Sequence, residues 1–105
     1  MGIRKSMEEQ IRVDGNRDIW LDKVQQALEV SKFTNINCNK TFYQVNADYK
    51  KFTVWGEISI TLISVDTTKE QIDIHIKATS NVDNIYALFK SPNKTIIEAF
   101  KSGLN

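Results

Sequence analysis

The feature that most constrains this 105-residue sequence is a strict alternation of apolar and polar side chains in its second half. In the segment 52–65 the even positions up to 62 hold apolar residues and one glycine, namely Phe52, Val54, Gly56, Ile58, Ile60 and Leu62. After a predicted turn at 66–69, the segment 71–79 repeats the pattern with Ile72, Ile74, Ile76 and Ala78. Successive side chains of a strand point to opposite faces of a sheet. The pattern therefore predicts an antiparallel sheet with one apolar face and one polar face.

Shorter segments predict three further strands and two helices. One strand begins at Met7 and ends near Val13, and two more cover 33–38 and 41–49. A helix over 17–30, capped by Asn16, carries an apolar stripe of Trp20, Val24, Ala27 and Leu28. A second helix begins at Ser91-Pro92, and its stripe consists of Ile96, Ile97, Phe100 and Leu104. The segment 81–90 between these elements is compatible with a helix, a loop or a lid.

Together these elements predict one two-layer α+β domain over residues 7–104, preceded by a flexible start at 1–6. The apolar face of the five-stranded antiparallel sheet matches the two helical stripes, so we expect both helices on that face. The order of elements resembles the TATA-binding-protein-like arrangement. The helix-grip fold of START-type lipid carriers is the alternative. The strand order stays open.

Composition excludes several classes of function. The single cysteine excludes a disulfide framework and a cysteine-based zinc or iron–sulfur site. The four glycines are isolated from one another, so no phosphate-binding loop is present, and we expect no cofactor. No apolar run reaches the roughly 20 residues of a membrane span, and no secretory signal is seen, which predicts a cytoplasmic protein. With 14 basic and 13 acidic residues, the net charge of +1 argues against nucleic acid as a partner.

Two segments carry a family resemblance. Residues 55–62 read Trp-Gly-Glu-Ile-Ser-Ile-Thr-Leu, which resembles a strand that opens on Trp-Gly-Glu in small bacterial α+β domains. The segment Ser91–Phe100 is similar to the closing helix of those domains, with Ser91-Pro92 in place of their usual Gly-Lys pair. The resemblance implies the fold. It implies no activity, because the family has none assigned, and the Ser91-Pro92 departure removes support for a shared anion-binding role.

The candidate site residues lie on the predicted polar face and are Trp55, Glu57, Ser59, Thr61, Asp73, His75 and Lys77. His75, the only histidine, would act as a general base if Asp73 oriented it and Ser59 or Thr61 lay beside it. Glu57 and Asp73 would hold a divalent cation with His75 if they met on this face. No nucleophile turn or metal-ligand spacing supports either reading, so an enzyme is the third hypothesis and no metal is expected.

The leading hypothesis is a non-catalytic interaction module. Trp55 interrupts the polar face, and an exposed aromatic patch is typical of a surface that binds a protein partner or a second copy. The segment 85–89 would remove that patch if it folded over Trp55. The alternative hypothesis is a binder of a small apolar ligand or lipid, in a pocket between helices and sheet lined by Trp20, Leu28, Ile60, Ile74 and Phe100.

Overall fold

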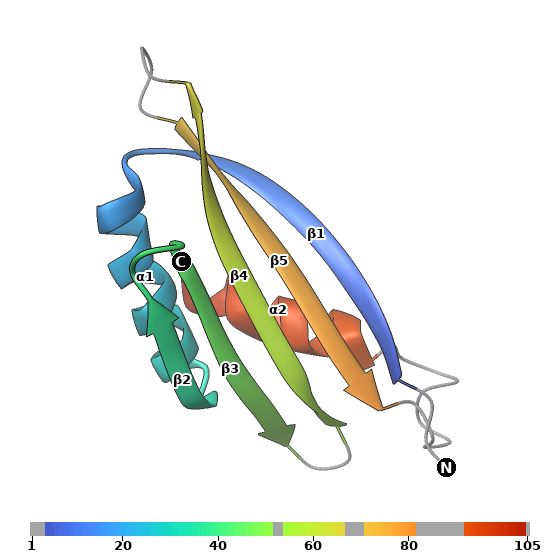
Figure 1. Cartoon of the computed structure of the whole chain (residues 1–105). Coiled ribbons are helices and arrows are strands. Elements are labelled where there is room, and N and C mark those ends of the chain that lie inside the picture. The colour runs from blue at the N-terminus through green and yellow to red at the C-terminus, as the bar shows by residue number, and fades with distance from the viewer. Residues whose placement is uncertain (1–3, 52–53, 67–70, 82–91, 105) are drawn as a thin grey trace.

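A computed structural model describes residues 4–51, 54–66, 71–81 and 92–104 (Figure 1). Its elements, in chain order, are β1 (Arg4–Asp14), α1 (Arg17–Val30), β2 (Thr34–Asn39), β3 (Gln44–Lys51), β4 (Val54–Asp66), β5 (Gln71–Asn81) and α2 (Pro92–Leu104). The strands form one antiparallel sheet in the order β1-β5-β4-β3-β2. Strands β2 to β5 are therefore a meander, and β1 joins it at the far side of β5.

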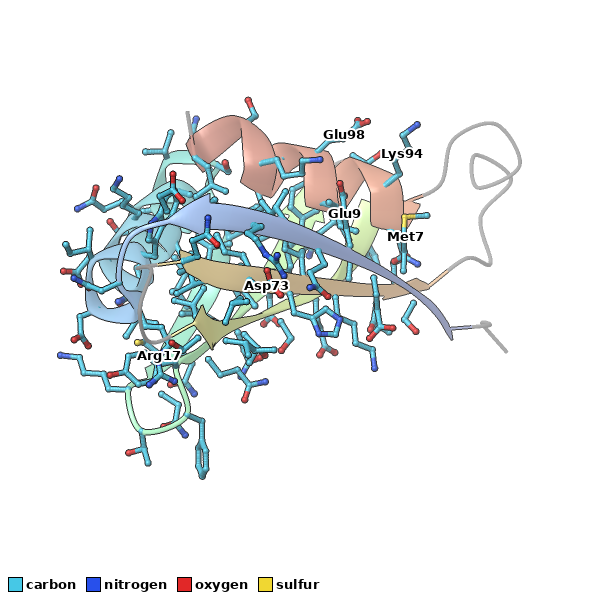
Figure 2. All side chains as sticks on the ribbon, turned by 90° about the horizontal axis from the view of Figure 1, so that it is seen from above. Met7, Glu9, Arg17, Asp73, Lys94 and Glu98 are labelled. Carbon is cyan, nitrogen blue, oxygen red and sulfur yellow. The ribbon has the colours of Figure 1, made fainter. Side chains whose placement is uncertain are left out.

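Both helices lie on the same face of the sheet, as the matching apolar stripes predicted (Figures 1 and 2). The core is formed between them and the even-numbered residues of β4 and β5, including Ile58, Ile60, Leu62, Ile72, Ile74 and Ile76. From the helices, Val24, Leu28, Ile96 and Phe100 are fully buried against these residues. The predicted two-layer α+β fold is thus confirmed.

Most predicted elements have the expected place, with one difference at the start of the chain. The helix α1 has the predicted bounds, and the backbone N–H of Ile19 donates to the Asn16 side chain at 2.9 Å, as expected of an N-cap. The strand β1 begins at Arg4, three residues before the predicted start, because its first residues continue the pairing with β5 up to Asn81. The predicted turn at 66–69 lies largely outside the described residues, and the segment 82–90 and Ser91 lie wholly outside them.

Helix α2 is fixed to the sheet by specific contacts. The buried side chains of Ser80 and Asn93 share a hydrogen bond of 2.6 Å. Gly56 lies under α2, since a Cβ atom there would come within 2.9 Å of the Ile96 side chain.

Figure 2 places Glu9 beside α2, where its carboxylate pairs with Lys101 at 2.6 Å. That ion pair accounts for an acidic residue on the helix-facing side of β1. Within the described residues, neither helix combines the length and apolar character that a membrane crossing requires.

Candidate functional site

The face of the sheet opposite the helices, called the polar face below, is covered by none of the elements that the structure describes (Figure 2). Antiparallel pairing arranges its side chains in rows that cross the sheet. One row contains Asn39, Gln44, Thr61, His75 and Gln10, the next contains Asn37, Asn46, Ser59, Lys77 and Glu8, and a third contains Asp48, Glu57, Thr79 and Ser6.

These rows enclose a hollow of about 530 Å³, called the polar hollow below. All five strands contribute to its lining, so it spans the width of the twisted sheet. The lining is dominated by carboxamides, hydroxyls and charged groups: Glu8, Asn35, Asn37, Gln44, Asn46, Asp48, Glu57, Ser59, Thr61, His75, Lys77 and Thr79, with Ala47 and Ile58 from the core side.

The polar hollow contains five of the seven predicted site residues, namely Glu57, Ser59, Thr61, His75 and Lys77. Trp55 lies one row beyond Glu57, on the same face, and is 54% exposed. The ammonium of Lys50 lies 5.1 Å from the centre of its indole ring. Asp73 lies at the other end of the face, opposite Ile63 and Arg12. The segment 85–89, considered as a cover for Trp55, lies outside the described residues.

Asp73 is fully engaged by β1. Its carboxylate accepts hydrogen bonds from the Arg12 Nε at 2.9 Å and from the Gln10 carboxamide at 2.7 Å. The hydrogen bond from Arg12 lowers the pKa of Asp73 below its usual value, with further help from the charge of Arg12 and from Gln10, while burial opposes them. The same pairing raises the pKa of Arg12. This carboxylate is therefore a structural ion-pair partner.

The Asp73–His75 pair that the enzyme hypothesis requires is not formed. His75 Nε2 lies 3.3 Å from the carboxylate of Glu8, across the β1–β5 pair. The physical reason is that Gln10 and Arg12 on β1 occupy the Asp73 carboxylate, while Glu8, a diagonal neighbour of His75 on that strand, is long enough to reach the imidazole.

Thr61 does lie directly opposite His75, as the enzyme hypothesis required of these neighbouring strands. The Ser59 hydroxyl, however, accepts a hydrogen bond from Gln44 at 2.9 Å instead of meeting the histidine. The metal hypothesis requires Glu57 to meet Asp73, and the two do not meet, because Glu57 pairs with Thr79, three rows away from Asp73. In the described ranges no three His, Cys, Asp or Glu residues are placed to share a metal ion.

The predicted apolar pocket between helices and sheet is formed differently. Leu28, Ile60, Ile74 and Phe100 are fully buried and fill the core. Trp20 borders a cavity of about 220 Å³ that it shares with Ile11, Val13, Lys101 and Leu104.

Sequence reasoning missed the contribution of β1, β2 and β3 to the polar hollow. The alternation of Gln44, Asn46 and Asp48 with buried residues is visible in the sequence, and placing β3 beside β4 would have assigned them to the site. Asn35 and Asn37 carry no such signal, because Asn35 has a φ of 51° and the β2–β3 register shifts between Thr34 and Asn37.

No family model matches the sequence, and no curated protein matches it. The similarity to small bacterial domains noted above accordingly stays a prediction. Solved structures do match the fold.

A point mutant of norcoclaurine synthase from Thalictrum flavum, in complex with a transition-state analogue, aligns with a TM-score of 0.65 at 9% identity, covering 99% of this chain and 93% of that one. The same enzyme in complex with dopamine and hydroxybenzaldehyde aligns with a TM-score of 0.64 at 7% identity, covering 98% and 85%. A truncated form of it gives a TM-score of 0.64 at 7% identity, covering 98% and 92%.

At these identities the likeness concerns the fold alone. The matched structures have the helix-grip arrangement, which is the second of the two topologies considered from the sequence. The chain described here is similar to them in fold.

Proposed function

We propose that this protein is a non-catalytic binding protein that holds a hydrophilic ligand on the polar face of its sheet. The observation that carries the proposal is the polar hollow, a depression of about 530 Å³ to which all five strands contribute. This volume lies within the range of roughly 300–1,000 Å³ typical of small-molecule sites. Strands also hold side chains more rigidly than loops do, which lowers the entropic cost of binding.

The chemistry of the polar face favours binding over turnover. Asp73 is held by Arg12, Glu8 lies beside His75, and the Ser59 hydroxyl is hydrogen-bonded to Gln44. Nucleophilic catalysis needs a hydroxyl within hydrogen-bond reach of its base. Within the described residues, His75 has no hydrogen bond to Ser59 or Thr61, the two candidate nucleophiles.

The fold supports this proposal in a general way. One matched structure is a complex of norcoclaurine synthase with dopamine and hydroxybenzaldehyde, so a chain with this fold can hold small molecules. The polar hollow lies on the uncovered face of the sheet. Its ligand must therefore be complementary to the side chains that line the hollow in this chain.

A second candidate function is the binding of a small apolar ligand between the helices and the sheet. The cavity beside Trp20 supports it, because Ile11, Val13 and Leu104 give that cavity a largely apolar lining. In a Trp55→Phe variant, Trp20 is the only remaining tryptophan and reports directly on this cavity. An apolar probe that binds with micromolar affinity and changes the fluorescence of Trp20 would support this function. An unchanged Trp20 spectrum would count against it.

The leading proposal is tested by filling the polar hollow. Ser59→Arg places a long side chain at its centre, whereas Gln26→Arg makes the same charge change on an exposed position of α1, on the helix side of the molecule. Each protein, expressed in its own host and purified gently, is examined by native mass spectrometry.

We expect wild type and Gln26→Arg to retain a bound species that Ser59→Arg lacks. A retained species that is a protein partner or a second copy would assign the polar face to association between chains instead of to a small ligand. A species that all three proteins retain equally, or that none retains, would contradict the proposal.

A further inference from the structure

The two edges of the sheet differ in how well they resist pairing with another strand. At one edge β2 is short, Asn35 has a φ of 51°, and the register with β3 shifts between Thr34 and Asn37. A short, irregular edge strand of this kind discourages pairing with other chains. At the other edge β1 contains no proline and pairs with β5 over its whole length without a register shift. Among the described elements, none lies along its outer side (Figure 1).

The outer side of β1 presents backbone groups at alternate residues. The N–H of Leu62 on β4 donates to the Tyr43 carbonyl at 2.9 Å, which fixes the side to which each residue of β4 directs its N–H and C=O groups. Successive residues of a strand direct these groups to opposite sides. Through the registers of β4 with β5 and of β5 with β1, the odd-numbered residues of β1 bond to β5 and the even-numbered residues point outward. The outward groups form a template for one more antiparallel strand.

A second copy of β1 can supply that strand, and the side chains select how the two copies align. In a two-fold symmetric antiparallel pair, outward residues lie opposite outward residues, so the axis passes through one residue of each copy. Like charges come directly opposite one another when that residue is Glu8, Glu9, Ile11 or Arg12. An axis nearer either end of β1 pairs only a short part of the strand. An axis through Gln10 pairs Ser6 to Asp14 with no like charges opposite.

On the polar face, this alignment brings opposite charges together. Glu8 lies opposite Arg12 of the second copy, twice by symmetry, and the two Gln10 carboxamides meet on the axis. Arg12 binds Asp73 through Nε and Nη2, and its side chain stays 57% exposed, so Nη1 faces the outer edge without a hydrogen bond to any described residue. The side chain of Glu8 is 58% exposed. Cross-strand pairs of opposite charge stabilise a sheet, and like charges destabilise it.

On the helix side, the same alignment covers apolar surface. Met7, which is 38% exposed, lies opposite Val13 of the second copy, and Val13 lines the cavity of about 220 Å³ beside Trp20. The unbranched side chain of methionine adapts well to such an irregular apolar surface. The acidic residue on this side, Glu9, is already paired with Lys101 at 2.6 Å, so its charge does not oppose the association.

We infer that two copies of this chain associate through their β1 strands, aligned on Gln10, and so join their sheets into one continuous sheet. The two-fold axis is perpendicular to that sheet. The helices of both copies therefore lie on one face and both polar hollows on the other. The inference goes beyond the function proposed above and does not depend on what the polar hollow binds.

The association is tested by sedimentation equilibrium of the whole chain at concentrations up to about 1 mM, which detects millimolar and tighter dissociation constants. We expect a monomer–dimer equilibrium. Glu8→Lys sets like charges opposite one another at two symmetric positions and should raise the dimer dissociation constant about tenfold or more. The matched control, Glu29→Lys, makes the same charge change at an exposed position of α1 and should leave the constant unchanged. Circular dichroism melts check that both variants are folded.

Cysteine cross-linking tests the alignment. The background is Cys38→Ser, which removes the single native thiol. Gln10→Cys then places two thiols at the axis, with Cα atoms about 5.5 Å apart, a distance that a disulfide spans. In the matched variant Glu8→Cys, the two thiols lie four residues apart along the strands, about 14 Å. We expect mild oxidation to link the dimer through Gln10→Cys and not through Glu8→Cys. Equal linkage in the two variants would overturn the alignment.

The outcomes keep this inference separate from the function proposed above. Ser59→Arg, on the polar face, should dimerise as wild type does. In native mass spectrometry the dimer adds the mass of a whole chain, so only mass bound beyond whole chains reports a ligand. A monomer at every concentration, or equal dimerisation of Glu8→Lys and wild type, would overturn the inference. So would a dimer that Ser59→Arg loses and Glu8→Lys keeps, because it would place the association on the polar face. A dimer that forms as expected in a chain without a Ser59-dependent ligand would leave the inference standing and contradict only the proposed function.

Discussion

At the scale of single residues, the strand register decides which polar groups meet. Asp73 and His75 are two positions apart on one face, and the enzyme hypothesis, the third of those considered from the sequence, required them to be partners. In the structure Asp73 accepts two hydrogen bonds from Arg12, at 2.9 and 3.3 Å, and His75 lies beside Glu8. Neither partner can be identified from the sequence, because both depend on β1 lying beside β5 instead of beside its neighbours in the chain.

The Asp73–Arg12 pair predicts a pH dependence of stability. The pKa of Asp73 in the folded state lies below the ordinary aspartate value of 3.8. The ionised carboxylate therefore stabilises the fold at a pH above that ordinary value. This contribution is lost as the pH falls through the lower, folded-state pKa. We expect Asp73→Asn to have a lower thermal midpoint than wild type at neutral pH, and the difference to shrink on acidification below about pH 4.

The measurement is a series of thermal melts followed by circular dichroism between about pH 2.5 and pH 7. Asp22→Asn, at an exposed position of α1, is the control. The difference between its thermal midpoint and that of wild type should not shrink on acidification. A wild-type curve that stays parallel to that of Asp73→Asn over the whole range would contradict the assignment.

The N-cap of α1 gives a second prediction at this scale. Asn16 satisfies the backbone N–H of Ile19, which has no partner within the helix. We expect Asn16→Ala to lower the free energy of unfolding in urea by about 1 kcal/mol. Asn16→Asp keeps the acceptor and should retain most of that stability. Equal losses in the two variants would show that the cap is not the cause.

At the scale of elements, the packing of α2 on the sheet explains a residue that the alternation left unexplained. Gly56 occupies an even position of β4, among Ile58 and Ile60, where a large apolar residue would be expected. A Cβ atom at this position would lie 2.4 Å from the backbone carbonyl oxygen of Thr79 and 2.9 Å from the Ile96 side chain. Glycine is therefore required here, first by the close approach of the β5 backbone and then by the Ile96 side chain of α2.

We accordingly expect Gly56→Ala to lower the free energy of unfolding by about 1–3 kcal/mol, the usual cost of overpacking a core. Chemical denaturation measures the change. Ser64→Ala, at an exposed position near the other end of β4, is the matched control and should change stability little. Shortening the helix side chain with Ile96→Val should recover only part of the loss, because the nearest atom belongs to the backbone. A Gly56→Ala variant as stable as wild type would contradict this packing.

The elements themselves were largely predictable, for identifiable reasons. The helix α1 has a capping residue and an apolar stripe, and β4 and β5 have uninterrupted alternation, so local patterns suffice for them. The start of β1 at Arg4 was not predictable, because its first residues are polar and are strand only through their pairing with β5. Glu9 likewise interrupts the apolar series of Met7, Ile11 and Val13, and only the position of Lys101 on α2 explains it.

At the scale of the whole molecule, the strand order predicts which strands resist local opening most strongly. β5 is flanked by β1 and β4, β4 is flanked by β3 and β5, and α2 packs on both. β2 is an edge strand with an irregular register. We expect amide hydrogen exchange, followed by NMR, to be slowest in β4 and β5 and faster in β2, because exchange reports local opening. Protection in β2 equal to that in β5 would contradict the order.

The candidate site shows the limit of sequence reasoning at this scale. That Glu57, Ser59, Thr61, His75 and Lys77 share one face follows from alternation alone. The depression among them does not, because it needs the twist of the sheet, the register shift in β2 and contributions from both edge strands. A hollow is a property of the assembled sheet, and no segment of the sequence carries it.

The division of the sheet into a buried face and an uncovered face has an evolutionary consequence. In β4, Ile58 and Ile60 are buried in the core, while Glu57, Ser59 and Thr61 point to the opposite face, so substitutions at the outward positions leave the core contacts in place. Such a chain can drift toward a new ligand through its outward positions without first having to regain lost stability. A combinatorial library restricted to those outward positions should therefore contain an unusually high fraction of folded members.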